Sequence, residues 1–353
     1  MADVSRPPRP PRRPGRTTDA DAGDDRGQLF LVGALSLAVL FVGFALLLNT
    51  AIYTENLATR NTDPGPDPSI SYRSAAEEAA REMLVHENAN NTAETDYTFP
   101  EVRTRYDRDV DSWSDGVGIH AARRARATDM TLDETSAVHG TRIEQTNGTL
   151  TFTNRSGATT WDVVDDVAVR DVRFTVDRDS LAASNTSALD NSPFHLRIRE
   201  QGTGETYRVY LFDDSDTGGD DVTVAVAHGG SIEQCTFTGG ATAAVDVSNA
   251  NINGTACDAF DLLDLTDTEV ETENLDLRFV NGDNAVGTYE LTVSSGLSFG
   301  PGTNFYDNEG PDADEGSPFL SAVVYEASVV VTYESTDVYY QTTIAIDPPG
   351  ELR

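Results

Sequence analysis

The chain has 353 residues, with 59 acidic side chains against 25 basic ones and a formal net charge of −34. Every basic residue is arginine and none is lysine. This balance argues against a nucleic-acid partner, because phosphate binding requires a basic face. Such a chain repels itself at low ionic strength, but about 1 M salt shortens the Debye length to about 3 Å and screens that repulsion. The composition indicates adaptation to brine of the haloarchaeal kind, with an ordinary acidic domain as the alternative.

The first 27 residues form a leader rich in arginine and proline, and an uninterrupted apolar run follows from Leu29 to Leu48. At about 1.5 Å per residue, a helix of this length spans roughly 30 Å, the hydrocarbon thickness of a bilayer. A cleaved secretory signal is the alternative, but its apolar core is usually about 7–15 residues long and ends at a small-residue site. Arginines concentrate before the run. The positive-inside rule therefore predicts a cytoplasmic leader (residues 1–27), a transmembrane helix (28–50) and an extracellular remainder.

Residues 51–134 are predicted to form an extracellular helical stalk and linker. Residues 74–77, Ser-Ala-Ala-Glu, fit a capping box that would open one helix. A further helix is expected from about Trp113 to Arg126. We interpret the arginines at its end, Arg123, Arg124 and Arg126, as local charge balance in an acidic domain.

From about residue 135, apolar and polar residues alternate with the period of a β-strand, as in Phe194, Leu196 and Ile198. One hairpin is predicted to join residues 275–279 to 289–293 across Asn-Gly-Asp-Asn, and another to join residues 323–333 to 338–346. Clean alternation is typical of antiparallel strands with one buried face. We therefore expect a mainly β protein: an N-terminal transmembrane helix plus a β-sandwich-like extracellular domain over residues 135–353, with one or two flanking helices.

The only cysteines, Cys235 and Cys257, both follow the apolar run. In an oxidising exterior they are predicted to form a disulfide, and a metal site, for which His228 is the close histidine, is the alternative. Glycosylation sequons mark exposed loops of exported proteins. Five lie beyond the predicted span, at Asn90, Asn147, Asn154, Asn185 and Asn253.

Two acidic loops are candidates for a cation site. In the first, Asp213, Ser215 and Asp216 belong to a segment that resembles the metal-dependent adhesion motif of von Willebrand A domains. In the second, Asp312 and Asp314 could supply oxygen ligands to a structural calcium ion. Solvated acidic loops are the alternative in both places, and no other cofactor is expected.

No catalytic residues are predicted. The five histidines are scattered, and none belongs to a short metal-binding spacing. Neither a nucleophile elbow nor a phosphate-binding glycine loop is present. The chain is therefore not expected to be an enzyme, although distant residues could still assemble a catalytic triad.

The junction before the apolar run reads Arg-Gly-Gln, Tyr53 lies near the outer end of the run, and an alanine-rich stretch follows at residues 75–80. Over about residues 26–85 the chain resembles TadE/TadG-like pilus-assembly proteins and archaeal prepilin-like proteins. The resemblance implies cleavage between Gly27 and Gln28 by a prepilin-type peptidase. Type IV pilins usually carry glutamate at the fifth mature position, where this chain has Val32.

Together these features predict a single-pass protein of the cell membrane with an extracellular C-terminal domain. Its expected partners are the lipid bilayer and pilus or cell-surface proteins. We expect a structural role as a minor prepilin-like or pilus-assembly component. The alternative is an adhesive or ligand-binding ectodomain, assisted by calcium through the acidic loops.

Overall fold

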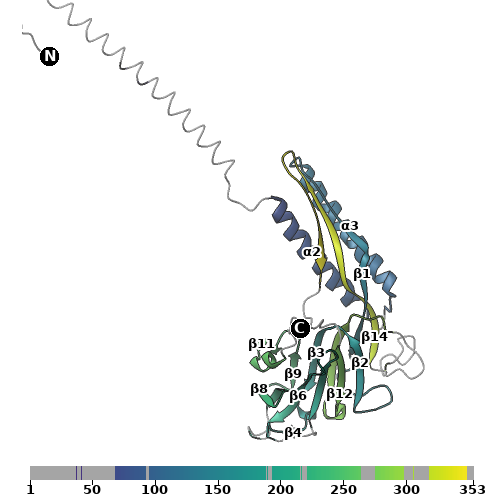
Figure 1. Cartoon of the computed structure of the whole chain (residues 1–353), viewed down its shortest axis with the longest axis vertical. Coiled ribbons are helices and arrows are strands. Elements are labelled where there is room, and N and C mark those ends of the chain that lie inside the picture. Colours follow the sequence, from purple (N-terminus) through teal and green to yellow (C-terminus); the bar gives the residue numbers. More distant parts are fainter. Residues whose placement is uncertain are drawn as a thin grey trace, which may run out of the picture. The chain divides into compact units, whose positions relative to one another are not determined.

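The computed structural model describes residues 68–92, 95–187, 193–214, 221–263, 275–297 and 318–347, together with the single positions 37, 41, 189, 216 and 305. The chain divides into two units, Met1–Pro66 and the compact Asp67–Arg353, and only the second is described below. It is mainly β, with two sheets and two α-helices (Figure 1). The mainly β class and the flanking helices are therefore confirmed.

The first sheet has eight strands. In spatial order they are β11 (Thr255–Ala256), β10 (Asn251–Ile252), β9 (Thr242–Asp246), β3 (Val169–Asp177), β13 (Gly287–Val293), β1 (Ala127–Gln145), β14 (Phe319–Glu334) and β15 (Tyr339–Ile346). All neighbouring pairs are antiparallel, as the alternating sequence predicts.

The second sheet has seven strands. Six lie in the order β2 (Trp161–Val167), β12 (Leu275–Val280), β5 (Phe194–Glu200), β6 (Thr206–Asp214), β7 (Asp221–His228) and β8 (Ser231–Thr238), and β4 (Ala183–Ser184) pairs in parallel with β6. Short 3₁₀ turns are η1 (Arg178–Ser180), η2 (Asp258–Leu262) and η3 (Gly282–Asn284).

Both sheets contribute to one apolar core. Its centre is a group of aromatic rings: Phe174 and Tyr289 from the first sheet, Phe194 and Phe279 from the second, and Phe152 between them. Phe152 makes edge-on contacts with Phe194 and Tyr289, each with 5.1 Å between ring centroids. Edge-to-face geometry is favourable because the positive ring edge meets the negative face. Two sheets sharing a core in this way are consistent with the predicted sandwich.

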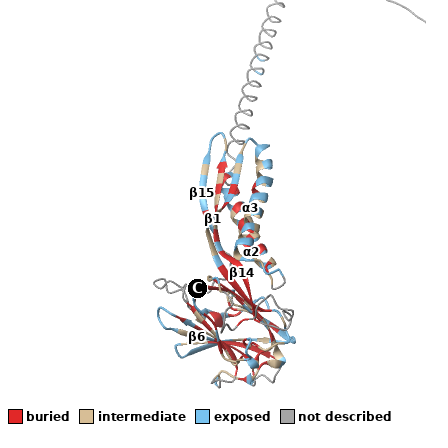
Figure 2. Ribbon diagram, turned by 90° about the vertical axis from the view of Figure 1, so that its right-hand side faces the viewer, coloured by how far each residue is buried: buried red, intermediate tan, exposed pale blue. Residues whose placement is uncertain are grey.

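β1 and β14 are long strands that continue beyond the sandwich. Their outer halves pair residues 127–133 with 328–334, and β15 joins them to make a three-stranded ribbon. Helices α2 (Pro68–Asn90) and α3 (Phe99–Ala122) lie along one face of this ribbon (Figure 1). A second core forms between them, with Ala76, Ala80 and Leu84 on α2, Val102, Tyr106 and Val110 on α3, and Met130, Val329 and Val331 on the ribbon. Figure 2 shows this buried seam in red between the helices and the strands.

The helix limits differ from those predicted. Residues 74–77 lie inside α2, which already begins at Pro68, so the capping box predicted there is wrong. The helix expected from Trp113 to Arg126 spans Phe99–Ala122 instead. Its start is capped at Thr98, whose backbone N–H donates to the carboxylate of Glu101 at 2.8 Å, and Pro100 fits a first turn that lacks partners for its N–H groups.

The predicted boundary at residue 135 falls inside β1, which begins at Ala127. The preceding helices are not separated from the β-rich part, because they pack directly on β1, β14 and β15. Of the two predicted hairpins, the last is confirmed: β14 and β15 pair antiparallel, with Glu334 opposite Tyr339.

The other predicted hairpin is wrong. β12 and β13 flank the Asn-Gly turn, but β12 pairs with β2 and β5 whereas β13 pairs with β1 and β3, in the other sheet. The turn crosses from one sheet to the other as η3. A Cβ atom on Gly282 would lie 2.0 Å from the carbonyl oxygen of Phe152. The glycine is therefore required for close backbone approach rather than for a two-strand turn.

Candidate functional site

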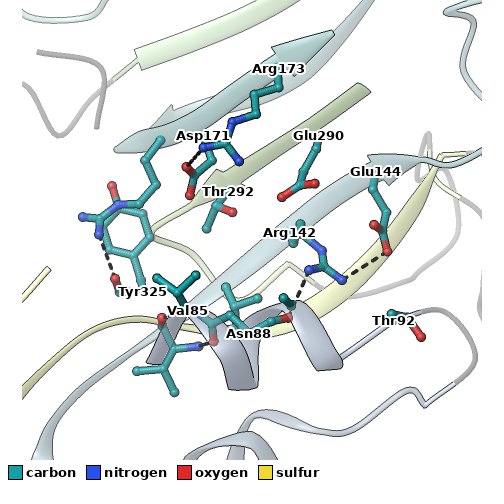
Figure 3. A pocket seen from close by; sticks show the side chains of 14 residues that line it. Val85, Asn88, Thr92, Arg142, Glu144, Asp171, Arg173, Glu290, Thr292 and Tyr325 are labelled. Atoms are coloured by element: carbon teal, nitrogen blue, oxygen red, sulfur yellow. Dashed lines mark hydrogen bonds and ion pairs between the residues drawn. The ribbon is translucent and has the colours of Figure 1, made fainter. Parts of the chain in front are cut away.

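A cavity of about 400 Å³ opens where the C-terminal half of α2 meets the first sheet. Its walls come from α2 and from strands β1, β3, β13 and β14 (Figure 3). Six charged side chains line it, three basic and three acidic: Arg142, Arg170, Arg173, Glu144, Asp171 and Glu290. Because three arginines and three carboxylates line one cavity, we take it as the candidate site among the described residues.

Arg142 of β1 closes the C-terminal end of α2. Its guanidinium donates to the carbonyl oxygen of Asn88 at 3.0 Å and to that of Asn91. The last carbonyls of a helix lack partners within the helix and carry the negative end of its dipole, so a cation there is stabilising. Arg142 also lies 3.4 Å from the carboxylate of Glu144. Its Nε is buried and has no hydrogen-bond partner among the described residues, so this donor could serve an acceptor in the cavity.

Arg170 of β3 is the largest fully buried side chain, at 1% exposed. Its guanidinium carbon lies 3.7 Å from the ring centroid of Tyr325, and Nη1 donates to the Tyr325 carbonyl oxygen at 3.0 Å. Cation–π contact and the carbonyl together offset the cost of burying the charge. Arg170 and Tyr325 therefore form a fixed part of the cavity wall.

The acidic side chains show the effect of burial. Burial raises the pKa of Glu144, and the neighbouring Arg142 offsets part of that rise. Burial likewise raises the pKa of Asp171, opposed by Arg173, whose Nη2 lies 3.0 Å from the Asp171 carboxylate. Asp171 also adopts a left-handed backbone conformation (φ 58°), which interrupts the pairing of β3 with β13 at this position.

This arrangement suits recognition of a small polar solute, because guanidinium and carboxylate groups of opposite charge can fix a ligand that carries both charges. Sequence analysis missed this cavity, because its arginines and carboxylates belong to strands that alternate in the ordinary way.

Of the residues predicted for the two cation loops, Asp213 and Asp216 are described. Asp213 is the last residue but one of β6, and its backbone N–H donates to the Ala182 carbonyl oxygen at 3.1 Å, while Asp216 accepts from Asn185 Nδ2 at 3.4 Å. Ser215, Asp312 and Asp314 lie outside the described residues. Within the described part of the chain, no group of three or more histidine, cysteine, aspartate or glutamate side chains could hold a metal ion.

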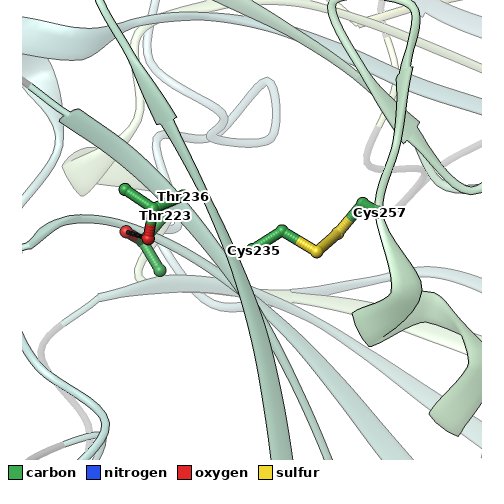
Figure 4. The surroundings of a disulfide bond; sticks show 4 residues. All are labelled: Thr223, Cys235, Thr236 and Cys257. Carbon is green, nitrogen blue, oxygen red and sulfur yellow. Dashed lines mark hydrogen bonds between the residues drawn. A yellow bond between two sulfur atoms is a disulfide. The ribbon is translucent and has the colours of Figure 1, made fainter.

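The predicted disulfide is present. Cys235 on β8 is bonded to Cys257, which precedes η2, with 5.7 Å between the Cα atoms (Figure 4). β8 is the last strand of its sheet and is largely exposed. The bond therefore fastens an edge strand, which pairs on its inner side with β7, where Thr223 and Thr236 hydroxyls are 2.9 Å apart.

The sequon asparagines differ in exposure. Asn253 is exposed, and its Oδ1 accepts from the backbone N–H of Ala244 at 2.9 Å. Asn90, Asn147 and Asn185 are half-buried. Asn154 is 6% exposed, and its Oδ1 accepts from the backbone N–H groups of Ser156 and Ala158, so it organises its own loop. This burial disfavours Asn154 as a glycan acceptor.

The predicted span from Leu29 to Leu48 and the Gly27–Gln28 junction lie outside the described residues, apart from Leu37 and Phe41. A search of the described helices for one both long and apolar enough to cross a bilayer gave none.

Residues 23–153 match the model of a family of unknown function, DUF7261. The matched range is less than half of the chain. It includes the apolar run, both described helices and β1, and it ends before β2 begins. No curated protein matches the chain.

Proposed function

We propose that the chain is a single-pass membrane protein whose compact β-rich unit lies outside the cell, as a minor prepilin-like or pilus-assembly component of a halophile surface. The observation that carries the proposal is the uninterrupted apolar run from Leu29 to Leu48, preceded by an arginine-rich leader. The disulfide supports an oxidising location, because such bonds are rare in reducing cytoplasm.

The family match covers the apolar run and the helical part in one continuous stretch of sequence. It begins before the apolar run and continues through α2, α3 and β1. The likeness to prepilin-like proteins lies in the Arg-Gly-Gln junction, the single apolar run, Tyr53 near its outer end and the alanine-rich continuation. In this proposal Gly27–Gln28 is the processing site, and the β-rich unit mediates contacts with other surface proteins.

Three measurements on the full chain, expressed in a halophilic host, test the proposal. The protein should sediment with membranes and resist extraction by alkaline carbonate. Protease added to intact cells should digest the β-rich unit. The mature N-terminus should be Gln28, and Gly27→Val should leave the leader attached. A chain recovered in the cell interior, or shielded from external protease, would contradict the proposal. If the protein stays in the membrane with Met1 as its N-terminus, the prepilin-like assignment is wrong but the single-pass anchoring still holds.

A second candidate function is ligand binding by the exterior unit, and the charged cavity favours it. The buried Nε of Arg142 and the carboxylates of Glu144 and Glu290 offer a small zwitterion both donors and acceptors. Calorimetry in concentrated salt, with glutamate as the zwitterionic probe and then with Ca²⁺ alone, tests this function. Heat with glutamate that Arg173→Gln reduces would support it. A flat trace with both probes would remove it, together with calcium assistance.

A further inference from the structure

The end of the ribbon farthest from the sandwich has an unusual surface. Here the chain leaves α3, turns into β1 at Ala127 and lies beside the β14–β15 turn, because Ala127 pairs with Glu334 and Glu334 pairs with Tyr339. The start of α2 is close by, since the Tyr72 ring lies 6.3 Å from that of Tyr333. We call this surface the ribbon end, formed by Ile70, Ile119, Arg123, Arg124, Arg126, Val338 and Tyr339.

Large apolar side chains concentrate at the ribbon end. From Pro68 onward, six large hydrophobic residues are exposed among those described, and four of the six are Ile70, Ile119, Val338 and Tyr339. Ile119 is 61% exposed and Tyr339 is 66% exposed. Figure 2 shows the ribbon turn and the tip of α3 as exposed. An exposed apolar group beside the polar tip of a tyrosine is the composition that favours a membrane interface.

Basic side chains concentrate at the same place. Arg123 and Arg124 are exposed, Arg126 is half-buried, and none of the three forms an ion pair with a described residue. Most other arginines of the described unit pair with carboxylates, as expected in a chain with net charge −34. Glu334 and Asp337 on the β14–β15 turn and Asp129 on β1 are the exposed carboxylates at this end, so the three arginines lie in a surface that carries charges of both signs.

Charge at a helix terminus explains part of this surface but not all of it. Arginines after α3 stabilise the negative end of its dipole, which is the local role that the sequence suggests. That role does not require exposed isoleucine, valine and tyrosine on three separate elements beside them. The combination fits a surface that presents apolar side chains next to arginines.

The position of the ribbon end along the chain indicates which partner this surface meets, namely the membrane that holds the apolar run. Nineteen residues separate Leu48, the end of the apolar run, from Pro68, the first residue of α2. Even fully extended, they reach no farther than roughly 70 Å. Once the run is embedded in lipid, α2 and the neighbouring ribbon end therefore stay within reach of the bilayer surface.

We propose that the ribbon end docks on the outer leaflet of the membrane that holds the chain's own apolar run. Ile119, Val338 and Tyr339 enter the interfacial layer, and Arg123, Arg124 and Arg126 bind anionic lipid phosphates. This inference rests on the proposed single-pass anchoring. Docking fixes the ribbon upright on the membrane and places the sandwich at the distal end of the unit.

Brine determines which forces can act in this contact. At about 1 M salt the Debye length is about 3 Å, so long-range attraction between arginines and lipid is lost. Direct guanidinium–phosphate hydrogen bonds and apolar burial act at contact distance and persist. The contact should therefore depend on the apolar residues in concentrated salt and gain dependence on lipid charge as salt is lowered.

The test uses the full chain reconstituted into phosphatidylglycerol vesicles in concentrated salt. The two native cysteines are bonded to each other, so Val338→Cys introduces the one free thiol for a fluorescent label. Ser231→Cys, exposed at the start of β8 in the sandwich, is the matched control. Vesicle flotation reports anchoring, and quenching by lipids that carry a spin label reports docking.

The label at residue 338 should lose roughly half or more of its emission to the spin-labelled lipid, and the label at residue 231 should not change. Ile119→Gln combined with Tyr339→Ser should reduce quenching several-fold, and Arg123→Gln with Arg124→Gln should reduce it most in the lowest salt that retains the fold. If the protein floats with the vesicles but the label at residue 338 is not quenched, the docking proposal is wrong and the proposed membrane anchor still holds. If the label is quenched only after a second surface protein is added, the ribbon end does not dock on lipid by itself, and the proposal is overturned. A chain that does not float would instead refute the proposed function.

Discussion

The side chain of Asn88 on α2 binds both backbone polar groups of Val324 on β14. Its Nδ2 donates to the Val324 carbonyl oxygen at 2.8 Å, and its Oδ1 accepts from the Val324 N–H at 2.9 Å. β15 pairs with β14 only from Ala327 onward, so the earlier part of β14 has an open edge. An asparagine amide presents the same donor and acceptor as a backbone peptide. Asn88 therefore takes the place of a missing strand and joins the helix to the sheet.

Asn88→Leu should destabilise the protein by about 1–3 kcal/mol, because two hydrogen bonds disappear and two backbone groups of β14 lose their partners. Asn88→Asp should also destabilise, since it keeps the acceptor but loses the donor to the Val324 carbonyl. Denaturant unfolding at fixed high salt measures the change. Asn90→Leu is the control, because the one hydrogen bond between the Asn90 amide and a described side chain is to His86 in the same helix. Equal losses for the two leucine variants would contradict the strand-replacement role.

Arg142→Met should cost roughly 3 kcal/mol, because it uncaps α2 and leaves Glu144 buried without its cation. Adding Glu144→Gln should recover part of that loss, and the free energies of a double-mutant cycle would give the coupling. Arg278→Gln is the control. Arg278 forms an exposed ion pair with Asp162 at 3.2 Å, and such pairs contribute less than about 1 kcal/mol. A loss at Arg142 no larger than that at Arg278 would show that the helix end needs no cap.

Cys235→Ala combined with Cys257→Ala should lower the free energy of unfolding by about 3 kcal/mol, because the bond closes a loop of 22 residues in the unfolded chain. The loss should be largest at β8, where hydrogen exchange of the amides paired with β7 should accelerate. A reducing agent should reproduce the effect in the native protein and have none in the double variant. An unchanged exchange rate in β8 would indicate that β7 alone holds this edge.

Sequence periodicity predicted individual strands well but not their partners. The strand at Phe194 and the last hairpin are confirmed, because alternation and a short polar turn are local signals. The strands flanking Gly282 satisfy the same local rule, yet they belong to different sheets. The deciding contact is the approach of Gly282 to the Phe152 backbone, which is distant in sequence. The residues within the turn therefore cannot predict this contact.

The cavity was hidden for a similar reason. Arg142 and Glu144 alternate with Ile143, which is the ordinary pattern of a strand with one wet face. They are buried because the end of α2 covers that face, and covering depends on tertiary packing rather than on local sequence. The disulfide was predictable, in contrast, because two cysteines allow a single pairing.

Lowering the salt should unfold the described unit. With a net charge of −34 on the chain, repulsion grows as screening weakens, and cooperative folding should be lost below roughly 0.5 M salt. Circular dichroism during dialysis from concentrated salt measures the transition. Returning the protein to concentrated salt serves as the control for irreversible damage. A spectrum unchanged in dilute buffer would contradict adaptation to brine.

His195 should make stability depend on pH. It is 5% exposed and its ring lies tilted against that of Tyr210, with 4.6 Å between the centroids and with Arg197 and Arg208 nearby, and burial lowers its pKa to about 4 from an ordinary value near 6.5. Between these two values the unfolded chain binds more protons than the folded one, so stability falls as the pH falls from about 6.5 towards 4.

Denaturant unfolding at several pH values and constant high salt measures this slope. His195→Phe keeps a ring against Tyr210 but cannot bind a proton, so it should remove up to about 1.4 kcal/mol per pH unit of the decline in that window. Identical slopes for the native protein and His195→Phe would mean that the imidazole is already accessible to protons in the folded state.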